Sequence, residues 1–382
     1  MLTREEYTLL CSAEVREAIR QNRHRDPLTV ALDRSVVEAR LVATQLKYLA
    51  RAEAKLPTYV EAECILPPRA FEQASSERCA LHKPIRGGRV LDLTCGLGVD
   101  AWALSKQFKE VITLERNEVL ADITRENFRR LGVENVRVVT TDAESYVASC
   151  QEQFDWIYAD PDRRSESGKK LVRLEDCSPD VIALMPQLKR LAPALCLKNS
   201  PIFDVDEARR LFPDCAVEVV SLGGECKEVL ILTGEGVTPR LTATALELGS
   251  YTATNEEEPL APPTFDPAHY HYLIQPDVAL QKARLVRRHL ATKADVWSEN
   301  GYGFATQRPE EVLGRIYEIE RIEPYDPKGL KRALKGSKAE LLKRDFPVAI
   351  EELRRRLGVV AGNEKRLAFT KIGASYWTIW LK

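Results

Sequence analysis

The sequence predicts an α/β protein built around a doubly wound, mostly parallel sheet. Between residues 89 and 234, seven short runs rich in β-branched and other apolar residues alternate with other segments. These runs are continuously apolar, as expected of strands that are buried on both faces. The last two runs are separated by only GGECK, a hairpin distance, so we expect the final strand to be antiparallel.

The expected strands are, in order, 89–94, 110–115, 136–141, 154–160, 194–199, 216–222 and 228–234. The segments between the first five strands are long enough for crossover helices, which implies parallel pairing. The sequence therefore predicts a seven-stranded core over residues 87–240.

The segment before this core, residues 1–86, is predicted to be helical. A helix is expected over 40–56, where apolar residues recur at three- and four-residue spacing. Prolines 57, 67 and 68 then break the pattern. A short helix is expected over 75–83, with Ser75 or Ser76 as its N-cap.

After the core, residues 241–305 are predicted to form a linker and a small connecting domain. The acidic, proline-rich stretch 251–267 is the expected linker, and a helix is expected over 276–290. Residues 306–382 are predicted to be a basic α+β domain, whose expected elements are strands 314–325, 365–373 and 375–381 and helices 327–346 and 348–359. The WTIW pattern is expected to place Trp377 and Trp380 on one side, either packed in the core or, with Tyr376, available to stack on bases.

The composition is that of an ordinary soluble protein, with 44% hydrophobic and 30% charged residues among 382. Every apolar run is too short to span a membrane, so we expect no membrane partner. Two acidic residues stand where a signal peptide would be apolar. The nine cysteines form no CxxC pair and the five histidines form no metal-spaced cluster. We therefore expect reduced thiols, a cytoplasmic location and no metal site.

Charge is distributed unevenly along the chain. The formal net charge is −1, but residues 328–382 carry 14 Lys or Arg against 5 Asp or Glu. A basic tail on an acidic body indicates a polyanionic partner, and the alternative is a solvated helical face.

Three acidic residues stand at the ends of successive predicted strands: Asp92, Glu115 and Asp142. Gly96 and Gly98 follow the first of them, where glycines allow a tight turn and a close approach of backbone to ligand. Carboxyl ends of parallel strands meet at one edge of a sheet, so we expect a nucleoside site there, with Glu115 accepting the ribose hydroxyls.

The expected cofactor is S-adenosylmethionine rather than NAD. The turn CGLGVD lacks the third glycine of a dinucleotide fingerprint, and the carboxylates of Asp92 and Asp100 would repel a pyrophosphate. Cys95 is expected to contribute its backbone and not to act as a nucleophile. The neighbours Thr94, Arg116 and Ala143 complete the predicted cofactor site.

The fourth strand ends in a charged run, Asp160, Pro161, Asp162, Arg163 and Arg164. We predict that this loop is catalytic, because a carboxylate or carbonyl there can orient an acceptor for in-line methyl transfer, and the arginines can clamp a phosphate. The alternative is an ion pair of Asp162 with a neighbouring arginine. Lys198 and Asn199 end the fifth strand and are predicted to contact the substrate.

Several motifs resemble a known family: EQASSE (72–77), LDLTCGLGVD (91–100), ADPDRR (159–164), LKNSP (197–201), GGECKE (223–228) and PKGLKRALK (327–335). The chain resembles the bacterial class I S-adenosylmethionine-dependent methyltransferases with a THUMP-like C-terminal domain. The resemblance implies a Rossmann-like core and an RNA-binding type of appendage. It also implies that the segment from Gln73 to Glu77 folds over the cofactor, with Gln73, Ser76 and Glu77 as contacts. Lys331, Arg332 and Lys335, in the basic stretch, are predicted to contact the substrate.

We therefore predict an S-adenosylmethionine-dependent methyltransferase that acts on RNA, either tRNA or rRNA. Two alternatives remain open. One is a methyltransferase for a small molecule or a protein, and the other is a non-catalytic RNA-binding protein with a methyltransferase-like core.

Overall fold

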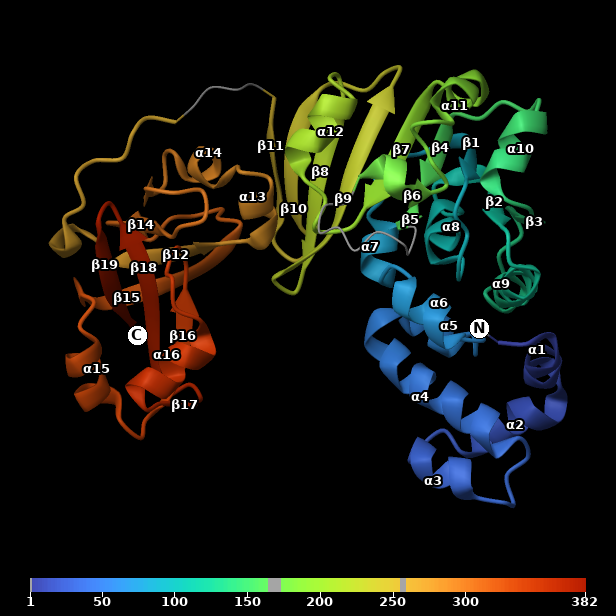
Figure 1. Ribbon diagram of the computed structural model, residues 1–382, viewed down its shortest axis with the longest axis horizontal. Helices are drawn as coiled ribbons and strands as arrows, with labels where there is room; N and C mark the ends of the chain where they lie inside the picture. Colours follow the sequence, from blue (N-terminus) through green and yellow to red (C-terminus); the bar gives the residue numbers. More distant parts are fainter. Residues whose placement is uncertain (1, 164–172, 255–258) are drawn as a thin grey trace. The chain divides into compact units, whose positions relative to one another are not determined.

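The computed structural model describes residues 2–163, 173–254 and 259–382 (Figure 1). The chain forms two compact units. The first comprises Met1–Cys215 and Val229–Thr238, and the second comprises Ala216–Glu228 and Pro239–Lys382.

A mostly parallel sheet forms the centre of the first unit. Its strands are β1 (Gly87–Asp92), β2 (Phe108–Glu115), β3 (Val136–Thr140), β4 (Trp156–Ala159), β7 (Ala194–Asn199) and β9 (Glu225–Gly234). They lie in the order β9-β7-β4-β1-β2-β3, and only β9 runs antiparallel, against β7. The predicted α/β class and the antiparallel final strand are confirmed. The order reverses between β1 and β4, the position at which open α/β sheets bind ligands.

Helices follow the parallel strands as the apolar pattern predicts: α8 (Val99–Leu104), α9 (Glu118–Arg130), α10 (Ala143–Ser149), α11 (Met185–Leu191) and α12 (Val205–Leu211). Side-chain caps fix several starts. Asn117 Oδ1 accepts from the Leu120 amide at 2.9 Å, and Asp142 caps α10 in the same way. Each cap places its helix directly after the carboxyl end of a strand.

The N-terminal region is helical, as predicted: α1 (Arg4–Cys11), α2 (Ala13–Gln21), α3 (Pro27–Leu32), α4 (Ala39–Lys55), α5 (Pro57–Glu61), α6 (Pro68–Gln73) and α7 (Glu77–Leu81). The long helix α4 covers the predicted 40–56, and Ser76 is the N-cap of α7.

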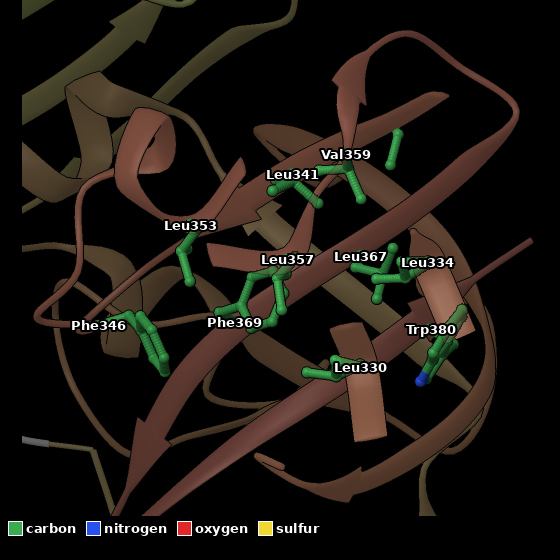
Figure 2. Packing of buried hydrophobic residues seen from close by; sticks show 11 residues of the cluster. Leu330, Leu334, Leu341, Phe346, Leu353, Leu357, Val359, Leu367, Phe369 and Trp380 are labelled. Carbon is green, nitrogen blue, oxygen red and sulfur yellow. The ribbon is translucent and has the colours of Figure 1, made fainter. Parts of the chain in front are cut away.

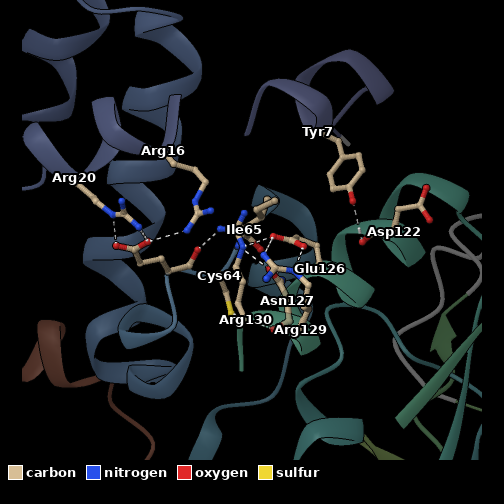
Figure 3. A network of polar contacts seen from close by, with 11 residues as sticks. Tyr7, Arg16, Arg20, Cys64, Ile65, Asp122, Glu126, Asn127, Arg129 and Arg130 are labelled. Carbon is tan, nitrogen blue, oxygen red and sulfur yellow. Dashed lines mark hydrogen bonds and ion pairs between the residues drawn. The ribbon is translucent and has the colours of Figure 1, made fainter. Parts of the chain in front are cut away.

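A buried polar junction attaches this helical region to α9 (Figure 3). The Asn127 amide, fully buried, donates to the Ile65 carbonyl at 2.9 Å and accepts from the Ile65 amide at 2.8 Å. Nearby, the Arg20 guanidinium donates two bonds to Glu63, at 2.7 and 2.6 Å. Because a buried amide with both ends paired is costly to displace, this junction fixes α6 and α7 beside the sheet.

The second unit begins with β8 (Ala216–Leu222), which pairs in parallel with β10 (Arg240–Ala245). β10 pairs antiparallel with β11 (Gly249–Ala253). The turn from β8 into β9 consists of Gly223 and Gly224, with φ of +63° and +76°, which is the left-handed geometry of a two-residue hairpin. The sequence analysis missed β10 and β11, and the predicted linker 251–267 begins inside β11.

An eight-stranded sheet forms the rest of this unit, in the order β13-β14-β12-β15-β19-β18-β16-β17. Its strands are β12 (Tyr272–Pro276), β13 (Asp295–Val296), β14 (Gly303–Ala305), β15 (Gly314–Pro324), β16 (Lys338–Lys343), β17 (Val360–Ala361), β18 (Lys365–Ile372) and β19 (Ser375–Leu381). The long strand β15 pairs with β12 at its start and with β19 at its end. Helices α15 (Pro327–Leu334) and α16 (Ile350–Leu357) pack on this sheet through a leucine-rich core (Figure 2).

Two expected helices of the second unit differ from the sequence prediction. The expected helix 327–346 ends at Leu334, and residues 338–343 form β16, because Gly336 (φ +79°) ends the helix. The expected helix 276–290 is two helices, α13 (Val278–Lys282) and α14 (Val286–Leu290), separated by Arg284 at φ +54°.

The two tryptophans of WTIW lie on opposite faces of β19, because residues three apart in a strand point to opposite sides. Trp380 belongs to the leucine-rich core of Figure 2, and its indole N–H donates to Glu323 at 2.7 Å. Trp377 packs in the second core, 5.0 Å from the Phe265 ring. Stacking of bases on Trp380 is therefore excluded by its burial.

Candidate active site

A cavity of about 380 Å³ opens at the carboxyl ends of β1, β2, β3 and β4, entirely within the first unit. Ten of the predicted site residues line it: Gln73, Thr94, Cys95, Gly96, Glu115, Arg116, Asp142, Ala143, Asp160 and Asp162. Seven other predicted residues of this edge do not line it: Ser76, Glu77, Asp92, Gly98, Pro161, Lys198 and Asn199. The side chain of Arg163 and the whole of Arg164 lie outside the described part of the chain.

Asp92 lies behind the cavity wall and shapes the turn. Its carboxylate is fully buried and accepts from the Thr94 amide at 2.9 Å and from the Thr113 hydroxyl at 2.6 Å. Burial raises the pKa of this carboxyl to about 7, because these hydrogen bonds offset only part of the desolvation cost. Asp92 thus acts on the site through Thr94, which lines the cavity.

The two glycines of the turn have different roles. A Cβ built on Gly96 (φ +54°) meets nothing within 4 Å, so this residue leaves a bare backbone wall in the cavity. A Cβ on Gly98 (φ +81°) would lie 2.6 Å from Thr124 Cγ2 and 2.7 Å from Phe128 Cζ. Gly98 therefore allows α8 to pack against α9, and Gly96 is the glycine that borders the cavity.

Two carboxylates at neighbouring strand ends are held in place before any ligand arrives. Glu115 accepts from the Gly96 amide at 3.0 Å and from the Asn117 amide at 2.8 Å, and burial raises its pKa. Asp142 accepts from the Ser145 amide at 2.7 Å, and the hydrogen bonds from Ser145 lower its pKa. A fixed, acceptor-only carboxylate beside a bare backbone wall suits the hydroxyls of a ribose.

A buried network of charges lies under the loop that follows β4. The Lys198 ammonium is 2.5 Å from Asp160 and 3.3 Å from Asp100, and it donates to Ser75 Oγ at 2.8 Å. The Lys83 ammonium, whose side chain is fully buried, lies 3.4 Å from the other oxygen of Asp100. The Lys198 ammonium joins the two aspartates, and its predicted contact with the substrate stays a prediction.

In this network the pKa values of Asp100 and Asp160 are shifted in opposite directions. Burial works to raise the pKa of Asp100, but the ammonium groups of Lys198 and Lys83 hold it well below its usual range. Burial raises the pKa of Asp160, and Lys198 offsets this only in part. Asp100 is therefore a fixed anion, and Asp160, which faces the cavity, is the carboxylate that is better placed to exchange a proton.

The loop itself is tied to both sides of the cavity. The Asp160 amide donates to Thr94 Oγ1 at 2.8 Å, and Asp162 accepts from the Gln73 amide group at 3.1 Å. The two-residue strand β5 (Asp162–Arg163) then pairs with β6 (Cys177–Ser178). Gln73 thus reaches the cavity from the helical region, as the resemblance implies.

The remaining predicted residues have local structural roles. Ser76 accepts from the Cys79 amide at 3.3 Å as the cap of α7, and Glu77 accepts from the Thr58 amide at 3.0 Å. Asn199 is 6% exposed and donates to the Leu197 carbonyl at 3.3 Å. Lys331, Arg332 and Lys335 lie exposed on or next to α15, in the second unit.

Sequence reasoning missed Lys83 and Arg69 as site residues, included Ser75 only as a possible helix N-cap within the segment expected over the cofactor, and used Asp100 only to exclude a pyrophosphate. Ser75 and Arg69 line or support the cavity from the helical region. The sequence signal that could have revealed the charge network was Lys198 itself, a lysine inside an apolar strand, because a buried ammonium requires a buried carboxylate.

The described residues lack both a metal-binding cluster and a membrane-spanning helix. Residues 2–163, 173–254 and 259–382 contain no group of three or more His, Cys, Asp or Glu side chains arranged to hold a metal ion. The helices in these ranges are all too short or too polar to cross a membrane.

Comparisons with known proteins indicate the class of enzyme to which the chain is similar. Residues 314–382 match the model of the THUMP domain-like family, and residues 71–176 match the model of Conserved hypothetical protein 95. An uncharacterized S-adenosylmethionine-dependent methyltransferase of Mycobacterium tuberculosis is 26% identical over 347 residues, covering 85% of this chain and 90% of the relative.

Two further relatives are informative. Ribosomal RNA small subunit methyltransferase J of Coxiella burnetii is 34% identical over 112 residues, covering 25% of this chain and 44% of the relative. The crystal structure of a Porphyromonas gingivalis W83 protein assigned as a methyltransferase superposes with a TM-score of 0.83 at 26% identity, covering 100% of this chain and 99% of that one. The chain is therefore an S-adenosylmethionine-dependent methyltransferase whose C-terminal segment is similar to a THUMP domain, with S-adenosylmethionine as cofactor.

Proposed function

We propose that this chain methylates RNA and that the methyl acceptor is held at the loop that begins with Asp160. One observation carries the proposal: the Asp160 carboxylate lines the same cavity as Glu115 and Gly96, so an acceptor bound to it lies beside the cofactor. The volume of about 380 Å³ falls within the range of small-molecule sites.

In this proposal the chain's residues hold and align two reactants. Glu115 and Asp142 take the nucleoside end of the cofactor, and the bare wall at Gly96 admits it closely. S-adenosylmethionine supplies an electrophilic methyl group. Asp160 accepts a hydrogen bond from the acceptor and can take up the proton that methylation releases. Alignment of this kind can lower the barrier by about 7–11 kcal/mol.

Lys198 is a positioning residue in this scheme. Its ammonium contacts Asp160 but does not line the cavity, and Asp100 and Ser75 hold that ammonium in turn. Without Lys198, Asp160 would face the negative charge of Asp100 with only the ammonium of Lys83 to compensate for it. The acceptor would then meet a carboxylic acid of raised pKa rather than an oriented carboxylate.

Three observations support RNA as the acceptor. The methyltransferase core is similar to an enzyme named for ribosomal RNA, the C-terminal segment matches a THUMP-like model, and residues 328–382 have a strong excess of positive charge. A basic surface attracts the phosphate backbone of a nucleic acid.

The test is transfer of tritium from labelled S-adenosylmethionine into total RNA from a strain that lacks the protein, followed by nucleoside mass spectrometry. We expect Asp160→Asn to lose transfer while retaining calorimetric binding of S-adenosylhomocysteine. The exposed Asp214→Asn is a matched control that should behave as wild type. Label in proteins or small molecules instead of RNA would refute the acceptor, and normal transfer by Asp160→Asn would refute the site.

A further inference from the structure

The second unit has a cleft of about 410 Å³ that methyl transfer does not use. All of its lining residues belong to this unit. They come from the β8–β9 turn, the β10–β11 connection, the stretch from β12 into α13, and the start of β15, together with Arg344 after β16. The GGECKE motif begins at this turn, and nothing in the proposed reaction accounts for it.

Arg344 in this cleft is a half-buried cation with no direct ion pair among the described residues, although the carboxylates of Asp277 and Asp345 act on it electrostatically from nearby. This partial burial of the side chain lowers the pKa of its guanidinium. It donates to the neutral side-chain oxygen of Gln281, and it makes no ion pair within the described ranges. The neighbouring Tyr302 hydroxyl is buried without a hydrogen-bond partner among those residues. A desolvated charge of this kind is costly unless an anion binds to it.

A second unpaired guanidinium lines the same cleft. Arg315 is exposed at the start of β15 and also makes no ion pair with any described residue. The cleft contains two carboxylates, and neither makes a direct ion pair with these arginines, although Asp277 attracts Arg344 from a longer distance. Asp277 accepts from the Ser221 hydroxyl at 2.5 Å and from the Ala279 amide at 2.8 Å, and Glu247 has a partner of its own.

One wall of the cleft is bare backbone. A Cβ built on Gly223 or Gly224 would meet nothing within 4 Å, so no side chain fills this side. The cleft can therefore admit a group the size of a phosphate next to the turn. Guanidinium groups bind phosphate oxygens in a planar, two-bonded fashion that suits Arg315 and Arg344.

We propose that this cleft binds a backbone phosphate of the RNA substrate, held by Arg315 and Arg344. The inference rests on the proposed RNA methylation, and it adds a defined contact point remote in sequence from the methyltransferase loop. It also differs from the basic face of α15, because the two arginines share one cleft instead of an open surface.

The experiment is filter binding of total RNA from the deletion strain to the full chain, repeated over a series of salt concentrations. We expect Arg315→Gln to weaken binding about tenfold and to reduce the log–log salt slope by about 0.7. The matched control is Arg321→Gln, which removes the same charge from the same strand, but from an arginine already paired with Glu320 and Glu323. The control should keep wild-type affinity and slope. Arg344→Lys, which retains the charge but loses the two-bonded geometry, should also bind more weakly with an unchanged melting temperature.

The outcomes separate this inference from the proposed function. If the wild type binds RNA and Arg315→Gln binds equally well, the cleft is refuted and RNA methylation is not. If the wild type binds no RNA, the proposed acceptor is refuted, and calorimetry with inorganic tripolyphosphate then tests the cleft alone. Binding of tripolyphosphate that Arg315→Gln weakens would support an anion site, and absence of binding would refute it.

Discussion

Replacing Lys198 with methionine should destabilise the first unit, because two aspartates would lose a shared counter-ion. Methionine has a similar length and no charge, so the variant removes the ammonium with little change in packing. The side chains of Lys198 and Asp100 are 9% and 12% exposed, which makes theirs a buried pair. Asp160 is 34% exposed, so solvent screens its pair and we discount it.

Removal of one partner from a buried pair costs about 3–5 kcal/mol. Lys83 remains 3.4 Å from Asp100 and compensates in part, so we expect the lower end, about 3 kcal/mol. For a unit of this size that corresponds to a melting temperature lower by roughly 6–12 °C. Differential scanning calorimetry at neutral pH measures the change, with the exposed Lys189→Met as the matched control.

The pH dependence gives a second readout of the same variant. Lys198 depresses the pKa of Asp100 in the folded state, so its stabilisation is present above the unfolded value of about 4 and is lost as pH falls further. The gap between wild type and Lys198→Met should therefore narrow on acidification through pH 4. An unchanged melting temperature at neutral pH would show that the ammonium does not hold the two aspartates.

Three other variants test separate parts of the structure. Gly98→Ala should lower the melting temperature, because the added Cβ would lie 2.6 Å from Thr124. Gly96→Ala should mainly weaken the calorimetric binding of S-adenosylhomocysteine. The reverse pattern would contradict the roles assigned to the two glycines. Asp92→Asn should flatten the pH dependence of stability. Because the pKa of Asp92 is about 7 in the folded state and about 4 in the unfolded state, the free energy of unfolding of the wild type should fall by up to roughly 1.4 kcal/mol for each unit of pH rise between about pH 4 and 7. Parallel plots of melting temperature against pH for the two proteins would argue against this pKa shift. Leu353→Ala removes a fully buried side chain from the core of Figure 2 and should cost about 2–5 kcal/mol, seen as earlier thermal unfolding of the second unit with cofactor binding unchanged.

The sheet and the general place of the site could be predicted because their signals are local. Continuous apolar runs located the strands, and the rule that carboxyl ends share an edge brought Glu115 and Asp142 together. The different structural roles of Gly96 and Gly98 could not be predicted in this way. The difference depends on which glycine packs against Thr124 and Phe128, two side chains of α9, and that is a tertiary contact.

The errors have the same origin. Residues 338–343 contain good helix formers, but Ala339 and Leu341 pack into the core as part of a strand paired with β18. Tertiary pairing therefore outweighed local propensity. Lys83 and Asp100 are far from Lys198 in sequence, and only the folded chain shows that their charges meet.

The path of β15 limits how the C-terminal segment can be studied in isolation. The match to the THUMP-like model begins at residue 314, the first residue of β15, yet that half of the strand pairs with β12, which lies outside the match. Expression of residues 314–382 alone would leave the first half of β15 without its partner strand β12, and it would leave Trp377 without its ring contact to Phe265. The truncated piece would present a bare strand edge and an uncovered indole, and such fragments tend to self-associate. A useful excision would start upstream of β12.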